Sequence, residues 1–316
     1  MRRTSVRLRC RMAKTASRSL HQQLCVITIG HCATSTHRTG SQSPMNSSAI
    51  NNALLKEAMF SKELLGSGVT QIRKANYATQ GLYFQAFSNL SIGLERIGKL
   101  CLTLDHFIET NGKFPTDSHL KNAIGHDLVK LYKQSQDLIS KRGLKMRTLK
   151  KLNNPIHSSI LNILSKFAKG DRYSNFDFLV GSSRQSDPTG EWYTKVDMQI
   201  YENDITRKKK EIIKNNAEMT GQFMSRYGMV LHTSEQGTVI NDYEDASHRT
   251  GVFEAVAPKR QLYILQIIRY WVEILIELQY LSMHISHEAT PYFNEIFAGF
   301  GNDDSYNRTR KTWDNF

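Results

Sequence analysis

The sequence predicts an all-α protein, a helical bundle with further helices packed on it. Three observations carry this prediction. From residue 54 onward, apolar residues recur every three or four positions, which is typical of helices with one buried face. Hydrophobic residues make up 40% of the 316, enough for a sizeable core. Arg269, Glu273 and Glu277 interrupt the most apolar stretch, 262–283, so the sequence predicts no membrane span.

Residues 1–44 differ in composition from the rest of the chain. They contain eight basic residues and no acidic one, so the net charge of +13 falls to +5 in residues 45–316. Such a leader is typical of a mitochondrial transit peptide. It equally fits sequence upstream of a true start at Met45, where an ordinary polar N-terminus begins. Cys101 is the single cysteine after the leader, which favours a reducing compartment, the cytoplasm.

The first region after the leader, 45–150, is predicted to form the helical bundle. A first helix covers 54–65 and ends at Gly66-Ser67-Gly68. A long helix with a broad apolar face follows over 80–109, and a third helix covers 126–140.

The second region, 151–316, predicts helices that pack on the bundle. The expected elements are a helix over 156–167, an irregular segment near 170–195 with a short strand or extended piece at 176–180, a long polar helix over 192–229, and a mainly apolar helix over 259–286.

A group of polar residues lies on the long helix and at the start of the next. Glu95 and Lys99 are four residues apart and share a face, with Arg96 beside them. His126 and Asp127 open the following helix, where an Asp favours the positive end of the helix dipole. Two antiparallel helices would bring both groups together. The result is either a network that fixes helix packing or a pocket for nucleotide, phosphate or RNA.

The segment around these residues resembles the HEPN superfamily of helical-bundle proteins, over about 77–140. The stretch Leu94-Glu95-Arg96 with Lys99 matches the family's polar helix face, and His126-Asp127-Leu128 matches its second motif. The resemblance implies a bacterial, cytoplasmic homodimer from a toxin–antitoxin, stress or phage-defence system. It further implies binding of RNA, nucleotide or an antitoxin-like partner protein, with no cofactor. A bacterial origin favours Met45 as the true start.

The same resemblance raises the alternative of a metal-independent endoribonuclease. Many HEPN proteins use Arg-x(4–6)-His, in which the Arg stabilises phosphate charge and the His transfers protons across a dimer. Arg226 and His232 have this spacing, although so short a pattern arises readily by chance, and Tyr227 departs from the polar residue the family favours after the Arg. Arg96 with His126 is the other candidate pair. A third function, a mitochondrial accessory protein in the matrix, requires a genuine transit peptide.

Two basic runs are candidate contacts for phosphate. Residues 141–151 hold six Lys or Arg, of which Lys145 and Arg147 are predicted to bind RNA. Acidic residues dilute the second run, Arg207–Lys210. His284 and His287 have a spacing that suits a metal but lack an evident third ligand, so no metal site is expected.

Overall fold

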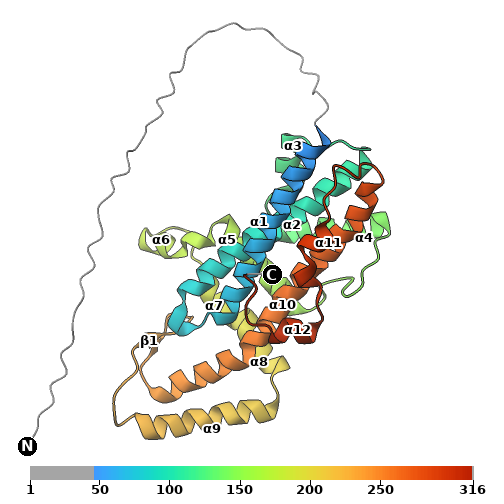
Figure 1. The fold of residues 1–316 in the computed structure, drawn as a ribbon. Helices are drawn as coiled ribbons and strands as arrows, with labels where there is room; N and C mark the ends of the chain where they lie inside the picture. Colours follow the sequence, from blue (N-terminus) through green and yellow to red (C-terminus); the bar gives the residue numbers. More distant parts are fainter. Residues whose placement is uncertain (1–45, 315–316) are drawn as a thin grey trace, which may run out of the picture. The chain divides into compact units, whose positions relative to one another are not determined.

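The computed structural model describes residues 46–314, and helices dominate this part of the chain (Figure 1). The predicted all-α class is confirmed. The expectations for the leader, 1–44, lie outside the described residues. None of the helices in the described range is both long and apolar enough to cross a membrane.

The first two long helices, α1 (Ser47–Lys74) and α2 (Gly81–Glu109), pack closely along their length. A Cβ atom on Gly68 would lie 2.6 Å from Leu90 Cγ, and one on Gly93 would lie 2.8 Å from Leu65 Cγ. The prediction that α1 ends at Gly66-Ser67-Gly68 is therefore wrong. These residues continue the helix, because packing against α2 offsets the low helix propensity of glycine.

The longest helix, α10 (Tyr243–Met283), packs against α1, α2, α4, α5 and α9. Its second half supplies much of the core and includes the buried Trp271, so the predicted buried helix is confirmed. The predicted start at Lys259 is wrong, since the helix continues N-terminally through Pro258 to the cap at Asp242. That earlier part is polar because only one side of it is covered.

The remaining elements are shorter. The 3-10 turn Tyr77–Thr79 joins α1 to α2. Between α2 and α9 lie α3 (Asp117–His119), a π-helical turn Leu120–Ile124, α4 (Leu128–Arg142), α5 (Pro155–Lys169), a 3-10 turn Asp171–Tyr173, α6 (Ser174–Leu179), α7 (Pro188–Trp192), a π-helical turn Tyr193–Asp197 and α8 (Met198–Asp204). After them come α9 (Arg207–Met224), the antiparallel strands β1 (His232–Thr233) and β2 (Val239–Ile240), α11 (Phe293–Ile296), a 3-10 turn Ala298–Gly301 and α12 (Asp304–Thr309).

Two predictions for the middle of the chain are corrected. Residues 176–180 form no strand, because α6 occupies Ser174–Leu179. The predicted helix over 192–229 is divided by an extended residue, Ile205, after which Thr206 caps α9.

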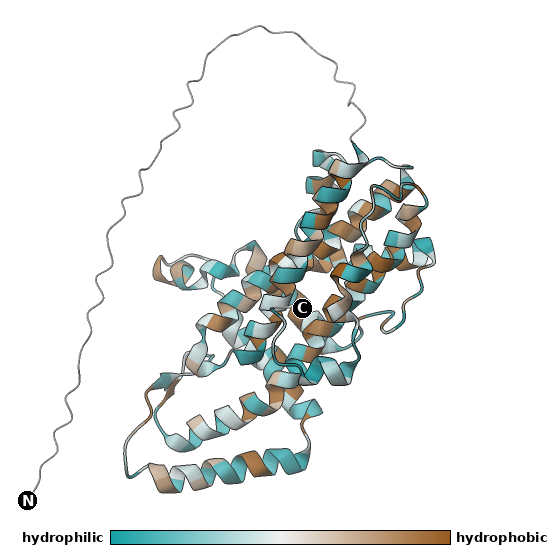
Figure 2. Cartoon of the chain, viewed as in Figure 1, coloured by the Kyte–Doolittle hydropathy of each residue, from teal (hydrophilic) through white to brown (hydrophobic). Residues whose placement is uncertain are grey.

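A buried ion pair joins this middle region to the bundle. The Arg260 guanidinium on α10 donates to Asp197 at 2.8 Å and to the Tyr83 hydroxyl on α2 at 3.3 Å. Figure 2 shows apolar residues throughout the bundle and also on α6 and α9, at its edges.

Candidate nucleic-acid interface

The predicted polar cluster forms at the junction of α2 and α4. His126 Nδ1 lies 2.8 Å from Glu95 Oε1, and Lys99 Nζ lies 2.8 Å from the same oxygen. Lys99 Nζ is also 3.3 Å from His126 Nδ1. Glu95 therefore holds Lys99 and His126 in one small group.

Arg96 does not join this group. Its guanidinium donates to both carboxylate oxygens of Glu57 on α1, each at 2.7 Å. Arg96 and His126 thus bind different carboxylates, and the structure shows no contact between these two residues of the proposed catalytic pair.

Asp127 caps α4 and joins it to α5. Its carboxylate accepts from the Val129 amide at 2.9 Å and the Ser165 hydroxyl at 3.1 Å, and it pairs with Lys169. Partial burial raises the pKa of Asp127, but the hydrogen bonds from Lys169, the backbone and Ser165 outweigh it, so the pKa is lowered. Each charged side chain of the cluster thus has an oppositely charged partner, within α2 for Lys99 and on another helix for Arg96 and Asp127.

A pocket of about 410 Å³ opens beside the cluster, lined by residues that include His126, Lys169 and Arg172. The Arg172 guanidinium lies 5.0 Å from the centre of the Tyr173 ring. Within residues 46–314 it has no carboxylate partner, so one cation of this pocket is available to an anion.

The basic run divides into two parts with different roles. At the end of α4, Lys141 binds Asp105 and Glu109 at 3.1 and 2.8 Å, and Arg142 binds Asp105 at 2.7 Å. These two cations fasten α4 to α2. Residues 144–151, which we call the basic loop, carry the other four: Lys145, Arg147, Lys150 and Lys151.

Two carboxylates of α10 hold the backbone of the basic loop. Glu273 accepts from the amides of Arg147 and Thr148 at 3.0 and 3.2 Å and also from the Thr148 hydroxyl. Glu277 accepts from the Lys145 amide at 3.4 Å. The acids nearest the loop therefore bind its main chain.

The four cationic side chains of the basic loop are exposed. In the described part of the chain, none of them forms an ion pair with a carboxylate. The basic loop thus presents four exposed cations, while hydrogen bonds to α10 hold its backbone in place. This arrangement suits the binding of a polyanion.

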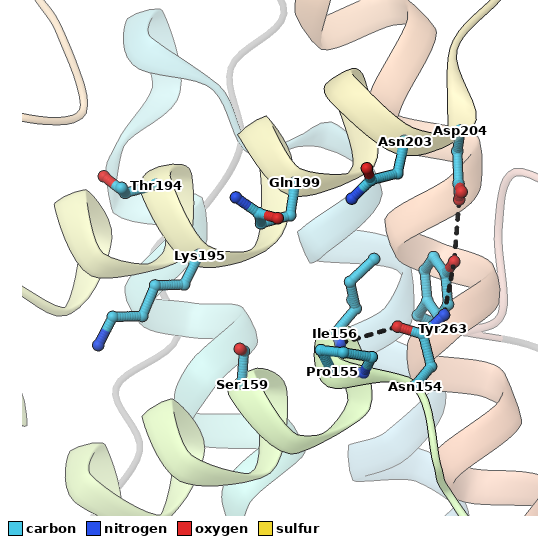
Figure 3. A pocket seen from close by; sticks show the side chains of 10 residues that line it. All are labelled: Asn154, Pro155, Ile156, Ser159, Thr194, Lys195, Gln199, Asn203, Asp204 and Tyr263. Carbon is cyan, nitrogen blue, oxygen red and sulfur yellow. Dashed lines mark hydrogen bonds between the residues drawn. The ribbon is translucent and has the colours of Figure 1, made fainter.

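A second pocket begins three residues after the loop, at the start of α5. It has a volume of about 490 Å³, and Figure 3 shows Gln199, Asn203 and Asp204 of α8 across from Ser159 and Asn154. For the residues described, Gln199, Asn203 and Ser159 make no side-chain hydrogen bond, so their polar groups are available to a ligand.

Tyr263 closes one end of this pocket. Its hydroxyl donates to Asp204 at 2.9 Å and accepts from the Asn154 amide at 3.2 Å (Figure 3). Burial and the Asp204 carboxylate raise the pKa of Tyr263 to about 12. An aromatic ring, the apolar Pro155 and Ile156, and free amides are the groups that bind unstacked nucleobases.

The second proposed catalytic pair is not assembled on one element. Arg226 follows the end of α9 at Met224, and His232 opens β1. Both side chains are exposed, and the His232 ring packs edge-on against Tyr77 at 5.6 Å.

The other predicted sites have local partners. In the run Arg207–Lys210, Arg207 pairs with Glu211 at 3.1 Å and Lys210 donates to the Glu202 carbonyl at 2.9 Å. His287 Nε2 lies 3.1 Å from the Tyr292 hydroxyl. Across residues 46–314 no three His, Cys, Asp or Glu side chains are grouped in a way that suits a metal.

The sequence did not predict that residues of α8 line the second pocket, or that two glutamates of α10 bind the backbone of the basic loop. Gln199 and Asn203 belong to no motif, and Glu273 and Glu277 are more than 120 residues from the amides they bind. No known protein family, curated protein or solved structure matches the chain.

Proposed function

We propose that this protein binds single-stranded RNA through the basic loop. The observation that carries the proposal is the division of charge at the loop. Glu273 and Glu277 bind its amides, and Lys145, Arg147, Lys150 and Lys151 keep their charges free. Binding phosphates then costs no existing ion pair.

The pocket at the start of α5 supplies a site for a base. It begins three residues beyond Lys151, so a strand whose phosphates contact the loop reaches it directly. Gln199 and Asn203 offer both donors and acceptors to the edge of a base, and single-stranded RNA exposes such edges.

The resemblance to HEPN proteins also favours RNA as the ligand, and it suggests the biological process in which the protein acts. On this proposal the protein acts in bacterial stress or phage defence, binds RNA or a nucleotide, and works with a partner protein. Endoribonuclease activity through Arg226 and His232, or through Arg96 and His126, is the alternative that the resemblance raises.

The test measures the affinity of the full chain for a labelled short single-stranded RNA as a function of salt. Replacing Lys145, Arg147, Lys150 and Lys151 with Gln is expected to weaken binding. It should also flatten the plot of log K against log salt by up to about 3, since each phosphate contact on a single strand contributes about 0.7. Asn203→Ala is expected to weaken binding without changing that slope.

The matched control removes the same charge elsewhere. Lys56, Lys74, Lys113 and Lys311 are exposed and have no carboxylate partner in the described part of the chain, and their replacement with Gln should leave the slope close to that of the parent. Equal losses of RNA affinity in both quadruple variants would show only a general effect of net charge and would refute the basic loop as the binding site. Cleavage of the RNA that stops in Arg226→Ala or Arg96→Ala would establish the endoribonuclease instead.

A further inference from the structure

Helix α9 presents an unusual apolar stripe on a face that no other part of residues 46–314 covers. Ile212, Met219 and Phe223 are 42, 53 and 66% exposed, although each is large and apolar. With Asn216 they occupy spacings of four, three and four residues, which is the seam of a coiled coil with one polar position. We call these four residues the α9 seam.

Packing against α10 fixes the direction of the α9 seam. On the inner side, Ile213 and Ala217 are buried. A Cβ on Gly251 of α10 would lie 2.7 Å from Ile213, and a Cβ on Gly221 would lie 2.9 Å from Glu244 Cβ. Because the two helices are in such close contact, α9 cannot rotate to bury its outer residues.

The exposed apolar surface continues past the end of α9. Tyr227, Met229 and Leu231 are all strongly exposed. A contiguous exposed apolar surface of this extent is typical of an interaction site, whereas apolar residues that are exposed singly are common on any protein. Figure 2 shows the apolar residues on α9, which runs beside the start of α10 at the edge of the bundle.

The geometry points to a second copy of this chain as the occupant of the α9 seam, with the two α9 helices antiparallel. A seam with a single Asn suits an identical seam, since the Asn216 amide finds a matching donor and acceptor near a two-fold axis. This surface lies outside the segment that resembles HEPN proteins, and it is independent of the basic loop.

Charge selects the antiparallel direction. The first turn of α9 holds Arg207, Lys208, Lys209 and Lys210 and no acid, an arrangement that the helix dipole disfavours. In a parallel pair the two basic turns would meet. In an antiparallel pair they lie about 27 Å apart, the length of α9, so that each lies beside the C-terminal end of the partner helix and the single Arg226 that follows it.

The first test is the mass of the full chain by sedimentation equilibrium. The parent is expected at twice the chain mass of 36.2 kDa, and Phe223→Glu at the single mass with unchanged helical circular dichroism. Phe60→Glu is the matched control, because Phe60 is 52% exposed on α1 and lies off the seam. A monomeric parent, or a dimer that survives Phe223→Glu, would overturn the proposal, as would a dimer that only Phe60→Glu disrupts.

The second test is the direction of the pair. In a background with Cys10, Cys25 and Cys32 changed to Ser, and Cys101 buried, Lys208→Cys and Arg226→Cys chains are treated with a short bis-maleimide. Mixed chains should cross-link to each other, and neither chain should cross-link to itself. Self-linking of each variant would show a parallel pair and refute the antiparallel assignment.

Discussion

The Asp127 carboxylate serves two helices at once. It accepts the amides of Val129 and Lys130 at the start of α4, and it accepts from Ser165 and Lys169 on α5. A carboxylate with so many donors favours its charged form, which explains the lowered pKa of Asp127 despite the burial. The residue predicted as part of a ligand site thus has a definite role in joining helices.

We expect the contribution of Asp127 to stability to depend on pH. Because its pKa in the folded chain lies below the ordinary value of about 3.9, its contribution is complete above that value and is lost as the pH falls through the folded pKa. Asp127→Asn keeps a capping side chain but loses the pairing with Lys169. The free energy of unfolding should therefore fall by about 0.5–1 kcal/mol at pH 7, allowing for a carboxylate that is partly exposed.

Urea denaturation of the parent and the variant between pH 7 and pH 3 measures this effect. The difference between the two proteins should shrink as the pH falls. Asp117→Asn is the control, because Asp117 forms an exposed pair with Lys121. A difference that stays constant with pH would contradict the assigned role of Asp127.

Helices α1 and α2 show why the sequence predicts some helix boundaries correctly and others incorrectly. Apolar periodicity predicted α2 and α5 nearly to their ends, because each has one long face turned to the core. The sequence alone does not show that α1 continues through Gly66–Gly68, since a glycine either ends a helix or allows close packing of a neighbouring helix, depending on what lies opposite it. That neighbour, Leu90, is more than twenty residues away.

The α1–α2 contact predicts a sharp difference between two glycines of one helix. Gly93→Ala should lower the free energy of unfolding by about 1–3 kcal/mol, because the new methyl group would overlap Leu65. Gly81→Ala places its methyl in open space and should be neutral or stabilise the protein by up to about 1 kcal/mol. Thermal and urea unfolding measure both. Equal effects at the two positions would mean that the helices separate more readily than the structure indicates.

The candidate interface was predictable in part for the same reason. The run 141–151 is visibly basic, and the sequence predicts Lys145 and Arg147 within it as RNA contacts. The sequence alone does not show that Lys141 and Arg142 are already paired, because their partners Asp105 and Glu109 belong to α2. The α8 side of the second pocket follows no periodic pattern, so only the fold brings it to α5.

Helix α10 connects two regions of the protein that differ in how deeply they are buried. Its second half is buried among α1, α2, α4 and α5, and its first half mainly supports α9. Helix α9 buries only Ile213 and Ala217 fully. Elements with few buried contacts open without global unfolding.

We therefore expect amide hydrogen exchange to be faster in α9 than in α2. The comparison is made on the Phe223→Glu variant by mass spectrometry, so that pairing of copies does not protect α9. In the parent at high concentration, α9 should become more protected while α2 is unchanged. Equal protection of both helices in the variant would show that α9 unfolds only with the rest of the chain.

The main-chain attachment of the basic loop separates two responses to ionic strength. Glu273 holds the loop through hydrogen bonds to amides, which dissolved ions compete with weakly, whereas attraction between Lys or Arg and phosphate is screened within about 8 Å at physiological salt. On the proposed function, concentrated salt should therefore release bound RNA and leave the conformation of the basic loop unchanged. Release would then need no rearrangement, and the same surface would be ready to bind again as soon as the salt is diluted.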